Sequence, residues 1–218
     1  MSYRLLVDIE TTGLPKAKSF GTYYHPSSIH MYSTSRVVEL GFIVFDDNYN
    51  IVYKYNSLRK PEDFMFKQVV YEKGPKQGQF INDITYKMCI SNGVLWLEMV
   101  NLLMKVIDKF AITEFYAFNV LFDYNCLLSE AYRNYNVAFI DVLTKLKPCC
   151  IMEYSKVYMK DMNSRKYNAE ATYNMLFKTD KKETHRALED CYIELEILKS
   201  LDDKYKKDKE PIILKYID

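Results

Sequence analysis

The sequence predicts a single α/β domain in which a mixed five-stranded sheet is flanked by helices. Two observations carry this prediction. In the second half of the chain, short β-type segments alternate with segments of helical periodicity, which is the pattern of a sheet covered by helices. The chain also has 218 residues, of which 49% are hydrophobic, and this is enough for one sizeable core.

The individual elements follow from apolar periodicity and from turn residues. We expect strands, the first three as a meander, over residues 4–10, 36–45, 51–58, 114–118 and 137–140. We expect helices over residues 93–110, 122–134, 168–177 and 184–201. Residues 16–35 are polar and aperiodic, which predicts a long loop, and residues 61–78 fit neither pattern.

Composition excludes several classes of protein. The net charge of +1 is too low for a dedicated duplex binder, although bound cations can supply positive charge to an acidic site. The five cysteines are odd in number and form no Cys-x-x-Cys pair, so we expect reduced thiols and neither disulfides nor zinc. The sequence has no membrane-span or signal-peptide pattern, which predicts a soluble, intracellular protein without a membrane partner.

The abundance of Tyr and Lys and the scarcity of Ala and Gly indicate an AT-rich genome, such as that of a large DNA virus or a parasite. The expected location is therefore the cytoplasm, with the nucleus, or the host cytoplasm for a viral protein, as alternatives.

Asp8 and Glu10 end the first predicted strand and are separated by one residue. Because strand side chains alternate, both carboxylates point to the same face. Two like charges this close raise each other's pKa, and a divalent cation between them would remove the repulsion. A solvated strand end explains the pair more simply, so these two residues alone decide nothing.

Two further carboxylates lie on or beside predicted helices. Asp123 lies where a strand gives way to a helix, and an acidic residue there commonly stabilises the first turn. Asp190 falls at the edge of the apolar arc of the helix over 184–201. A buried carboxylate needs a partner, which is equally well a metal ion or a distant Lys or Arg.

His185 lies five residues before Asp190, which turns the two about 140° apart on a regular helix. Both can serve one site only if His185 lies on the preceding loop or in the first turn, with Thr184 as the N-cap. We therefore expect a mobile histidine that swings toward a bound substrate. A structural or solvated histidine is the simpler alternative when His185 is considered alone.

Three segments occur in an order that resembles a known family. They are DIETTGL at 8–14, FNVLFDYNCLLSEAYR at 118–133 and HRALEDC at 185–191. With RVVELGFIVFD at 36–46 and the helix around 169–177, they resemble the DEDDh 3′–5′ exonucleases, which include proofreading ε-subunit-like enzymes and oligoribonucleases. The resemblance covers most of residues 3–201. It implies a ribonuclease-H-like fold, with an exonuclease domain over 1–205 and a C-terminal tail over 206–218.

The resemblance implies roles for the residues of these motifs. One Mg²⁺ or Mn²⁺ ion would bind the attacking water, a histidine would take its proton, and a second ion would steady the leaving 3′ oxygen. The matching metal ligands are Asp8, Glu10, Asp123 and Asp190, and the matching general base is His185. The expected substrate contacts are Thr11, Thr12, Gly13, Leu14, Asn119 and Phe122.

Two positions depart from the family, and one loop is longer than in bacterial proofreading subunits. Phe118 stands where many members have His, and Asn82 where many have His followed by Gly, which puts details of substrate contact in doubt. The 16–36 loop is a candidate for gripping substrate through base stacking and phosphate contacts, although an ordinary surface loop is an equal alternative. Its candidate residues are Tyr23, Tyr24, His25, Tyr32, Lys16, Lys18 and Arg36.

We therefore expect an enzyme that releases nucleoside 5′-monophosphates from the 3′ end of single-stranded or frayed DNA, with a replication or repair protein as its expected protein partner. No residue distinguishes deoxyribose from ribose, so an RNA-directed exonuclease is the first alternative. The second is an inactive nucleic-acid-binding subunit, which the intact acids argue against. Oligomeric state stays open.

Overall fold

The computed structural model describes residues 2–19, 21–66, 82–158 and 168–205. Its main sheet has the strand order β5–β4–β1–β6–β7. The strands are β1 (Tyr3–Thr11), β4 (Val37–Asp46), β5 (Ile51–Leu58), β6 (Glu114–Ala117) and β7 (Lys147–Cys150). β1, β4 and β5 pair antiparallel, whereas β6 pairs parallel with both β1 and β7. The predicted mixed five-stranded sheet is confirmed.

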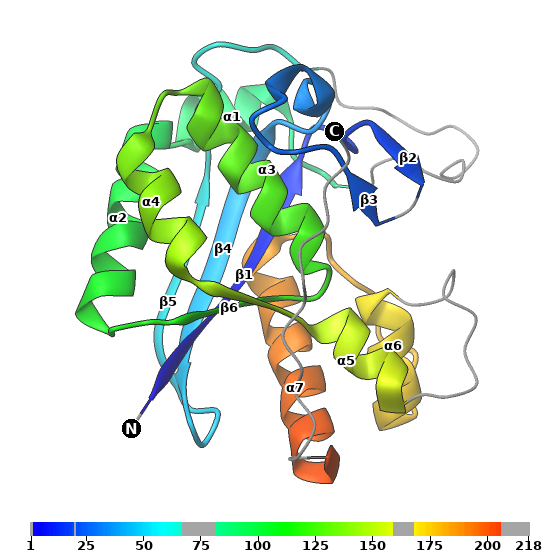
Figure 1. The fold of residues 1–218 in the computed structure, drawn as a ribbon. Helices are drawn as coiled ribbons and strands as arrows, with labels where there is room; N and C mark the ends of the chain where they lie inside the picture. The colour runs from blue at the N-terminus through cyan, green and yellow to red at the C-terminus, as the bar shows by residue number, and fades with distance from the viewer. Residues whose placement is uncertain (1, 20, 67–81, 159–167, 206–218) are drawn as a thin grey trace, which may run out of the picture.

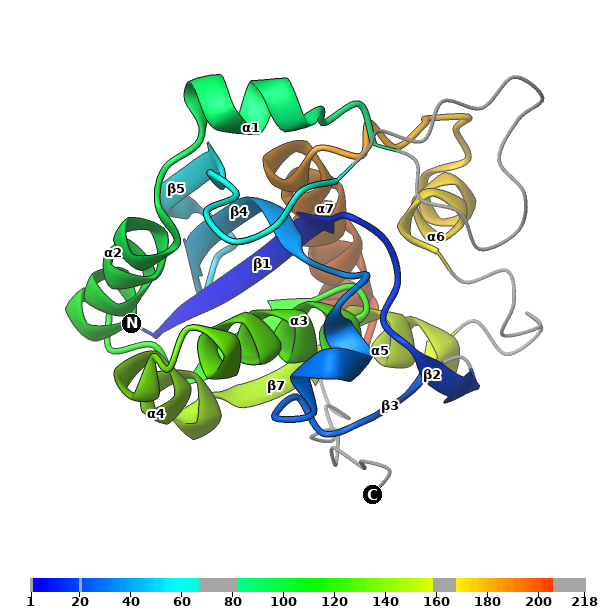
Figure 2. The same ribbon diagram turned by 90° about the horizontal axis from the view of Figure 1, so that it is seen from above.

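Helices cover both faces of this sheet (Figures 1 and 2). The long helix α7 (Ala187–Tyr205) packs along β1 and β4 on one face, with α5 (Ile151–Tyr158) and α6 (Ala169–Phe177) against it. The other face is covered by α3 (Val120–Arg133), with α4 (Val137–Lys145) and α2 (Trp96–Lys109) beside it. Every residue of β4 is buried, because β4 lies between two strands and beneath α7.

The sheet opens at the carboxyl end of β1. β6 pairs with β1 only at Leu5 and Leu6, so beyond Leu6 the strand keeps β4 as its one strand neighbour in the described part of the chain. The backbone N–H of Ile9 instead donates to Asp123 Oδ1 of α3, at 3.3 Å. This opening lets side chains from α3 and α7 reach the end of β1.

One predicted strand is wrong. Residues 137–140 belong to helix α4, where the side chain of Asn136 caps the first turn by accepting the N–H of Phe139 at 3.1 Å. Phe139 and Leu143 are both buried and lie one helical turn apart, so the apolar residues follow a helical period. The fifth strand is β7, which follows α4.

Other predicted elements need smaller corrections. The four predicted helices are found as α2, α3, α6 and α7, with ends shifted by up to four residues. The predicted 16–35 loop contains a hairpin of β2 (Ala17–Ser19) and β3 (Thr22–Tyr23) and the short helix η1 (Ile29–Tyr32). Helices α1 (Tyr86–Asn92) and α5 were not predicted.

Residues 67–78, part of the segment that fits neither pattern, lie outside the described residues, as does the tail over 206–218. In the part of the chain that the structure describes, no helix has the length and apolar character needed to cross a membrane.

Gly41 lies where β4 touches α7. A Cβ at this position would lie 2.4 Å from both the carbonyl carbon of Ala187 and the nitrogen of Leu188. Because both obstacles are backbone atoms, Gly41→Ala is expected to lower the free energy of unfolding by about 3 kcal/mol in chemical denaturation. The control is Gly21→Ala, whose Cβ meets nothing within 4 Å but whose positive φ costs about 1 kcal/mol. Equal losses in the two variants would contradict the close β4–α7 contact.

Candidate active site

Three of the predicted site residues meet at the open end of β1. Glu10 comes from β1, Asp190 from the first turn of α7, and His185 from the segment before α7. One potential ligand atom from each of these side chains lies within 4.8 Å of the other two. Residues that are far apart in the sequence therefore form one cluster.

Asp8 and Asp123 lie beside this cluster. Asp123, in the first turn of α3, accepts the Ile9 N–H that the sheet leaves open. Asp8 Oδ2 and Asp190 Oδ1 are both shielded from solvent, and neither has a hydrogen-bond partner among the described residues. Two buried carboxylate oxygens without partners are costly, and a bound cation would satisfy them.

The electrostatics of the cluster are those of crowded, poorly solvated acids. Burial raises the pKa of Asp123 to about 8. Burial, followed by the nearby charge of Glu183, raises the pKa of Asp190 to about 7. Burial is also the main cause that holds the pKa of Asp8 and Glu10 well above the ordinary range, with the neighbouring carboxylates adding to it.

Nearby groups compensate this charge only in part. Asn82 Nδ2 donates to Glu10 Oε2 at 2.9 Å, which opposes the rise in the pKa of Glu10. None of the four carboxylates forms an ion pair with a lysine or arginine that the structure describes. The donor set of hard carboxylate oxygens therefore fits divalent cations such as Mg²⁺ or Mn²⁺.

A fifth carboxylate, Glu194, was missed by the sequence analysis. Glu194 lies one helical turn after Asp190 on α7, is buried, and accepts the backbone N–H of Phe118 at 3.2 Å. Among the neighbouring charges that raise the pKa of Asp8, Glu194 is the largest. The spacing of four residues from Asp190 is the sequence signal that could have identified it.

His185 lies outside the helix, as its angular distance from Asp190 predicts. Its φ is +52°, and α7 begins two residues later, at Ala187. The predicted N-cap at Thr184 is wrong. Instead, the N–H of Ala187 donates to the carboxylate of Glu39, on β4, at 3.0 Å. A side chain from a neighbouring strand therefore satisfies the start of the helix.

The turn that follows β1 holds four of the predicted substrate contacts. Thr11 Oγ1 donates to the Gly13 carbonyl at 2.7 Å, and Thr12 Oγ1 donates to the Thr34 carbonyl at 2.9 Å. A Cβ on Gly13 would lie 2.9 Å from that same Thr34 carbonyl oxygen, so the turn needs glycine there. The apolar side chain of Leu14 is 49% exposed and therefore accessible to a ligand.

The other two predicted contacts lie at the start of α3. Asn119 is the residue before the helix, and its Oδ1 is buried without a hydrogen-bond partner in the described part of the chain. Phe122 is half-buried and precedes Asp123 directly. Both residues therefore lie beside the carboxylate cluster.

The 16–36 loop is only partly suited to gripping a substrate. Tyr23 and Tyr32 are buried, so their rings are not exposed for base stacking. The guanidinium of Arg36 is buried in ion pairs with Glu130 at 2.5 Å and Asp63 at 2.8 Å, which removes it from phosphate binding. These three predictions are wrong, because the loop folds into a packed unit.

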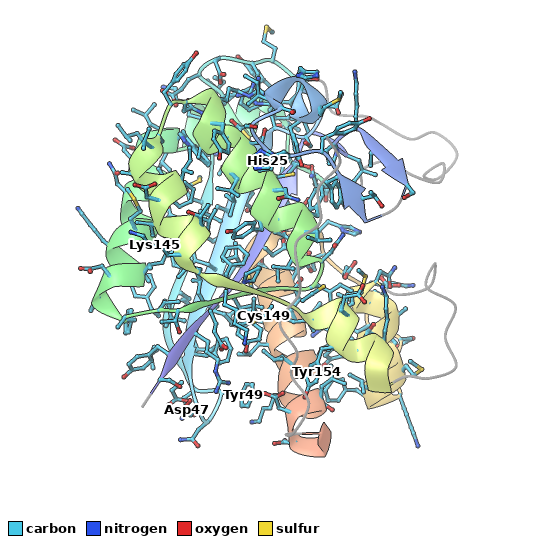
Figure 3. All side chains as sticks on the ribbon, viewed as in Figure 1. His25, Asp47, Tyr49, Lys145, Cys149 and Tyr154 are labelled. Carbon is cyan, nitrogen blue, oxygen red and sulfur yellow. The ribbon has the colours of Figure 1, made fainter. Side chains whose placement is uncertain are left out.

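The remaining loop residues are placed differently. His25 lies beside α3 (Figure 3), and its ring centroid is 6.1 Å from that of Tyr132 in this helix. Lys16 is exposed and Tyr24 is half-buried, so both remain candidates for substrate contact. The side chain of Lys18 lies outside the described residues.

The raised pKa values predict that the metal-free protein loses stability as the pH rises. A carboxyl group whose pKa is higher in the folded state binds its proton more tightly when folded, so deprotonation penalises the fold. For Asp123 this loss begins near the ordinary value of 3.8 and continues to about pH 8.

Asp123→Asn removes this penalty and keeps an acceptor for the Ile9 N–H. In EDTA at pH 8 it should stabilise the protein by about 2 kcal/mol, or roughly 4–8 °C in Tm, and by less at pH 5. Thermal unfolding at the two pH values measures this. A difference in Tm that does not grow with pH would contradict the prediction.

Comparison with known proteins agrees with this geometry. The model of the RNase T exonuclease family matches residues 5–198. The chain belongs to this family. As a member of the RNase T family, a group of DEDD 3′–5′ exonucleases, it has the predicted ribonuclease-H-like fold. No curated protein sequence is significantly similar to it.

Solved structures that share the fold of this chain include two complexes with DNA. Exonuclease X with 5′ overhanging duplex DNA is 19% identical, with a TM-score of 0.55 and 94% of each chain covered. E. coli exonuclease I with a dA16 oligonucleotide is 18% identical, with a TM-score of 0.65, and the similarity covers 95% of this chain but 42% of that one. A 3′-exonuclease that recognises the histone mRNA stem-loop is 8% identical, with a TM-score of 0.56 and coverage of 93% and 64%.

Proposed function

We propose that this chain is a DEDDh-type 3′–5′ exonuclease that hydrolyses single-stranded or frayed DNA from its 3′ end and releases nucleoside 5′-monophosphates. The observation that carries the proposal is the cluster of Glu10, His185 and Asp190 within 4.8 Å, beside Asp8 and Asp123. Phosphodiester hydrolysis needs ligands for cations and an acceptor for the proton of water, and these five side chains can supply both.

The four carboxylates would hold two divalent ions, Mg²⁺ or Mn²⁺. The unpartnered oxygens of Asp8 and Asp190 support this fit, as does the mutual repulsion of the acids. When bound, such ions relieve the negative charge on the phosphoryl oxygens and on the leaving group.

His185 would accept the proton of the attacking water. An imidazole nitrogen can accept a proton from water, and a ring nitrogen of His185 lies within 4.8 Å of a carboxylate oxygen of Asp190. The charge of Asp190 would stabilise the imidazolium that forms. The assignment to the DEDDh type rests on this residue.

The terminal nucleotide would lie between the turn after β1 and the start of α3. Leu14 offers an exposed apolar surface for the last base, and the tight turn at Gly13 lets the backbone of Thr12 and Gly13 approach the sugar. Asn119 Oδ1, which lacks a partner among the described residues, would accept a hydrogen bond from the substrate. Thr11, at the end of β1, and Phe122, in the first turn of α3, would flank the residues that contact the nucleotide.

DNA is the proposed substrate because exonuclease X and E. coli exonuclease I are both described in complex with DNA. The 3′-exonuclease that recognises an mRNA stem-loop makes RNA the alternative. The test compares single-stranded DNA and RNA of the same sequence, with Mg²⁺ or with EDTA. We expect faster Mg²⁺-dependent shortening of DNA. Faster degradation of RNA would support the alternative, and no degradation of either would indicate an inactive binding subunit.

A further inference from the structure

His185 adopts a backbone conformation that is uncommon for residues other than glycine. Its φ of +52° is in the left-handed region, which is uncommon for a residue with a Cβ. Such a conformation persists only where surrounding contacts hold it. The residues on both sides of His185 provide these contacts.

The first set of contacts follows His185 in the sequence. Arg186 donates to Glu39 on β4, with Nη2 at 2.6 Å from Oε1 and Nε at 3.1 Å from both carboxylate oxygens. The N–H of Ala187 donates to Oε2 of the same carboxylate at 3.0 Å. Glu39 is fully buried and is the strand partner of Glu10. A single carboxylate therefore fixes the two residues after His185 to the strand beside the site.

The second set of contacts precedes His185. The N–H of Glu183 donates to the Glu170 carboxylate at 3.1 Å, and the N–H of Glu170 donates to the Glu183 carboxylate at 3.0 Å. This reciprocal pair joins the segment before His185 to the first turn of α6. His185 thus lies between two fixed points, and the one that follows it is the more deeply buried.

We propose that Glu39 is a positioning residue for His185. It acts through its hydrogen bonds to the guanidinium of Arg186 and to the N–H of Ala187, the first residue of α7. Glu39 does not contact substrate, because it has no exposed surface. Its effect on the reaction therefore passes through the residues it holds. This inference rests on the proposed function, in which His185 is the general base.

Two other roles of the Glu39–Arg186 pair can be distinguished from positioning by experiment. Because Glu39 pairs with Glu10 across β1 and β4, its loss could weaken metal binding, and excess Mg²⁺ would then restore activity. The positive charge of Arg186 could bind phosphate directly, and its loss would then raise KM. Positioning of His185 predicts instead a loss confined to kcat, and no further loss once His185 itself is removed.

The test uses Glu39→Gln and Arg186→Ala, alone and combined with His185→Ala, on the full chain with single-stranded DNA. Arg186→Lys keeps a cation beside the buried Glu39 carboxylate, so it is expected to fold even if Glu39→Gln or Arg186→Ala does not. Each single variant should lower kcat about 10–30-fold, with KM and the Mg²⁺ requirement within two-fold of wild type. In the His185→Ala background each should lower kcat less than two-fold. Arg186→Lys should recover part of kcat.

The matched control is Lys182→Ala, which removes a positive charge and an ion pair with Glu170 from the same segment. Its kcat should equal that of wild type. The proposal would be overturned if each variant lowered kcat by the same factor with and without His185, or if high Mg²⁺ restored full activity. It would also be overturned if both single variants kept kcat within two-fold of wild type.

A second readout does not depend on activity. The chain has three histidines, so the imidazole NMR signal of His185 can be assigned by its loss in His185→Ala. It should shift or broaden in Glu39→Gln and Arg186→Ala and stay unchanged in Lys182→Ala, and an unchanged signal in all three would refute positioning. A wild-type protein that hydrolyses no DNA would contradict the proposed function, and this signal would still decide the positioning role.

Discussion

Asp8→Asn is expected to lower kcat by about 1,000-fold or more, which corresponds to roughly 4 kcal/mol of transition-state stabilisation. Asp8 is central to the carboxylate cluster, because the charges of Glu10, Asp123, Asp190 and Glu194 all act on it. The substitution keeps the shape of the side chain and removes the charge that would hold a divalent ion. Because its Oδ2 has no other partner among the described residues, no protein contact replaces the lost interaction.

The measurement is hydrolysis of a 5′-labelled single-stranded oligonucleotide over a range of Mg²⁺ concentrations. Asp47→Asn is the matched control, since Asp47 is exposed in the turn after β4, at the other end of the sheet (Figure 3). Its kcat should equal that of wild type. Recovery of Asp8→Asn activity at high Mg²⁺ would show that Asp8 tunes affinity rather than being required.

His185→Ala is expected to lower kcat by about 10²–10⁴-fold, the usual contribution of a general base. KM for DNA should stay near the wild-type value, because the turn after β1 and the start of α3 do not depend on His185. Metal binding, measured by calorimetry, should persist because the four carboxylates remain.

His30→Ala is the control for this prediction, since His30 is exposed on η1. It should leave kcat unchanged. Hydrolysis by His185→Ala within a few-fold of wild type would remove His185 from the mechanism, and with it the assignment to the DEDDh type.

Much of the fold was predictable because local patterns and tertiary packing agree. The strands β1, β4 and β5 are found close to their predicted bounds, since buried or alternating β-type residues fill each one. Residues 137–140 show the limit of this reasoning. Four residues are too few to separate a strand from a helical turn, and the decisive features are the Asn136 cap and the burial of Leu143 one turn beyond Phe139.

The site was predictable to a different degree. The spacing of Asp8 and Glu10, the place of Asp190 on its helix and the motif order singled out residues that the structure brings together at the end of β1. The contacts that hold these residues in place were not predicted. Glu39 and Glu194 were not identified because their partners, Arg186 and Phe118, come from distant segments. Contacts of this kind depend on tertiary structure. The spacing of Glu194 from Asp190, four residues along α7, is a local signal for Glu194, but no such signal marks Glu39.

The packed 16–36 loop illustrates the same point. Aromatic and basic residues in a polar loop suggested base stacking and phosphate contacts. Arg36 instead pairs with Glu130 of α3, some ninety residues away in the chain. Because its guanidinium pairs with the buried carboxylate of Glu130, Arg36 is not free to bind phosphate in the way that the sequence suggested.

The most direct test of the central claim is to degrade single-stranded DNA that carries a phosphorothioate block at either its 3′ or its 5′ end. The proposed site hydrolyses the terminal 3′ linkage with the help of divalent ions. Wild-type protein in Mg²⁺ should therefore be stopped by the 3′ block alone, release nucleoside 5′-monophosphates from unblocked DNA, and be inactive in EDTA. Protection by the 5′ block, or equal activity in EDTA, would contradict a metal-dependent 3′–5′ exonuclease built on these residues.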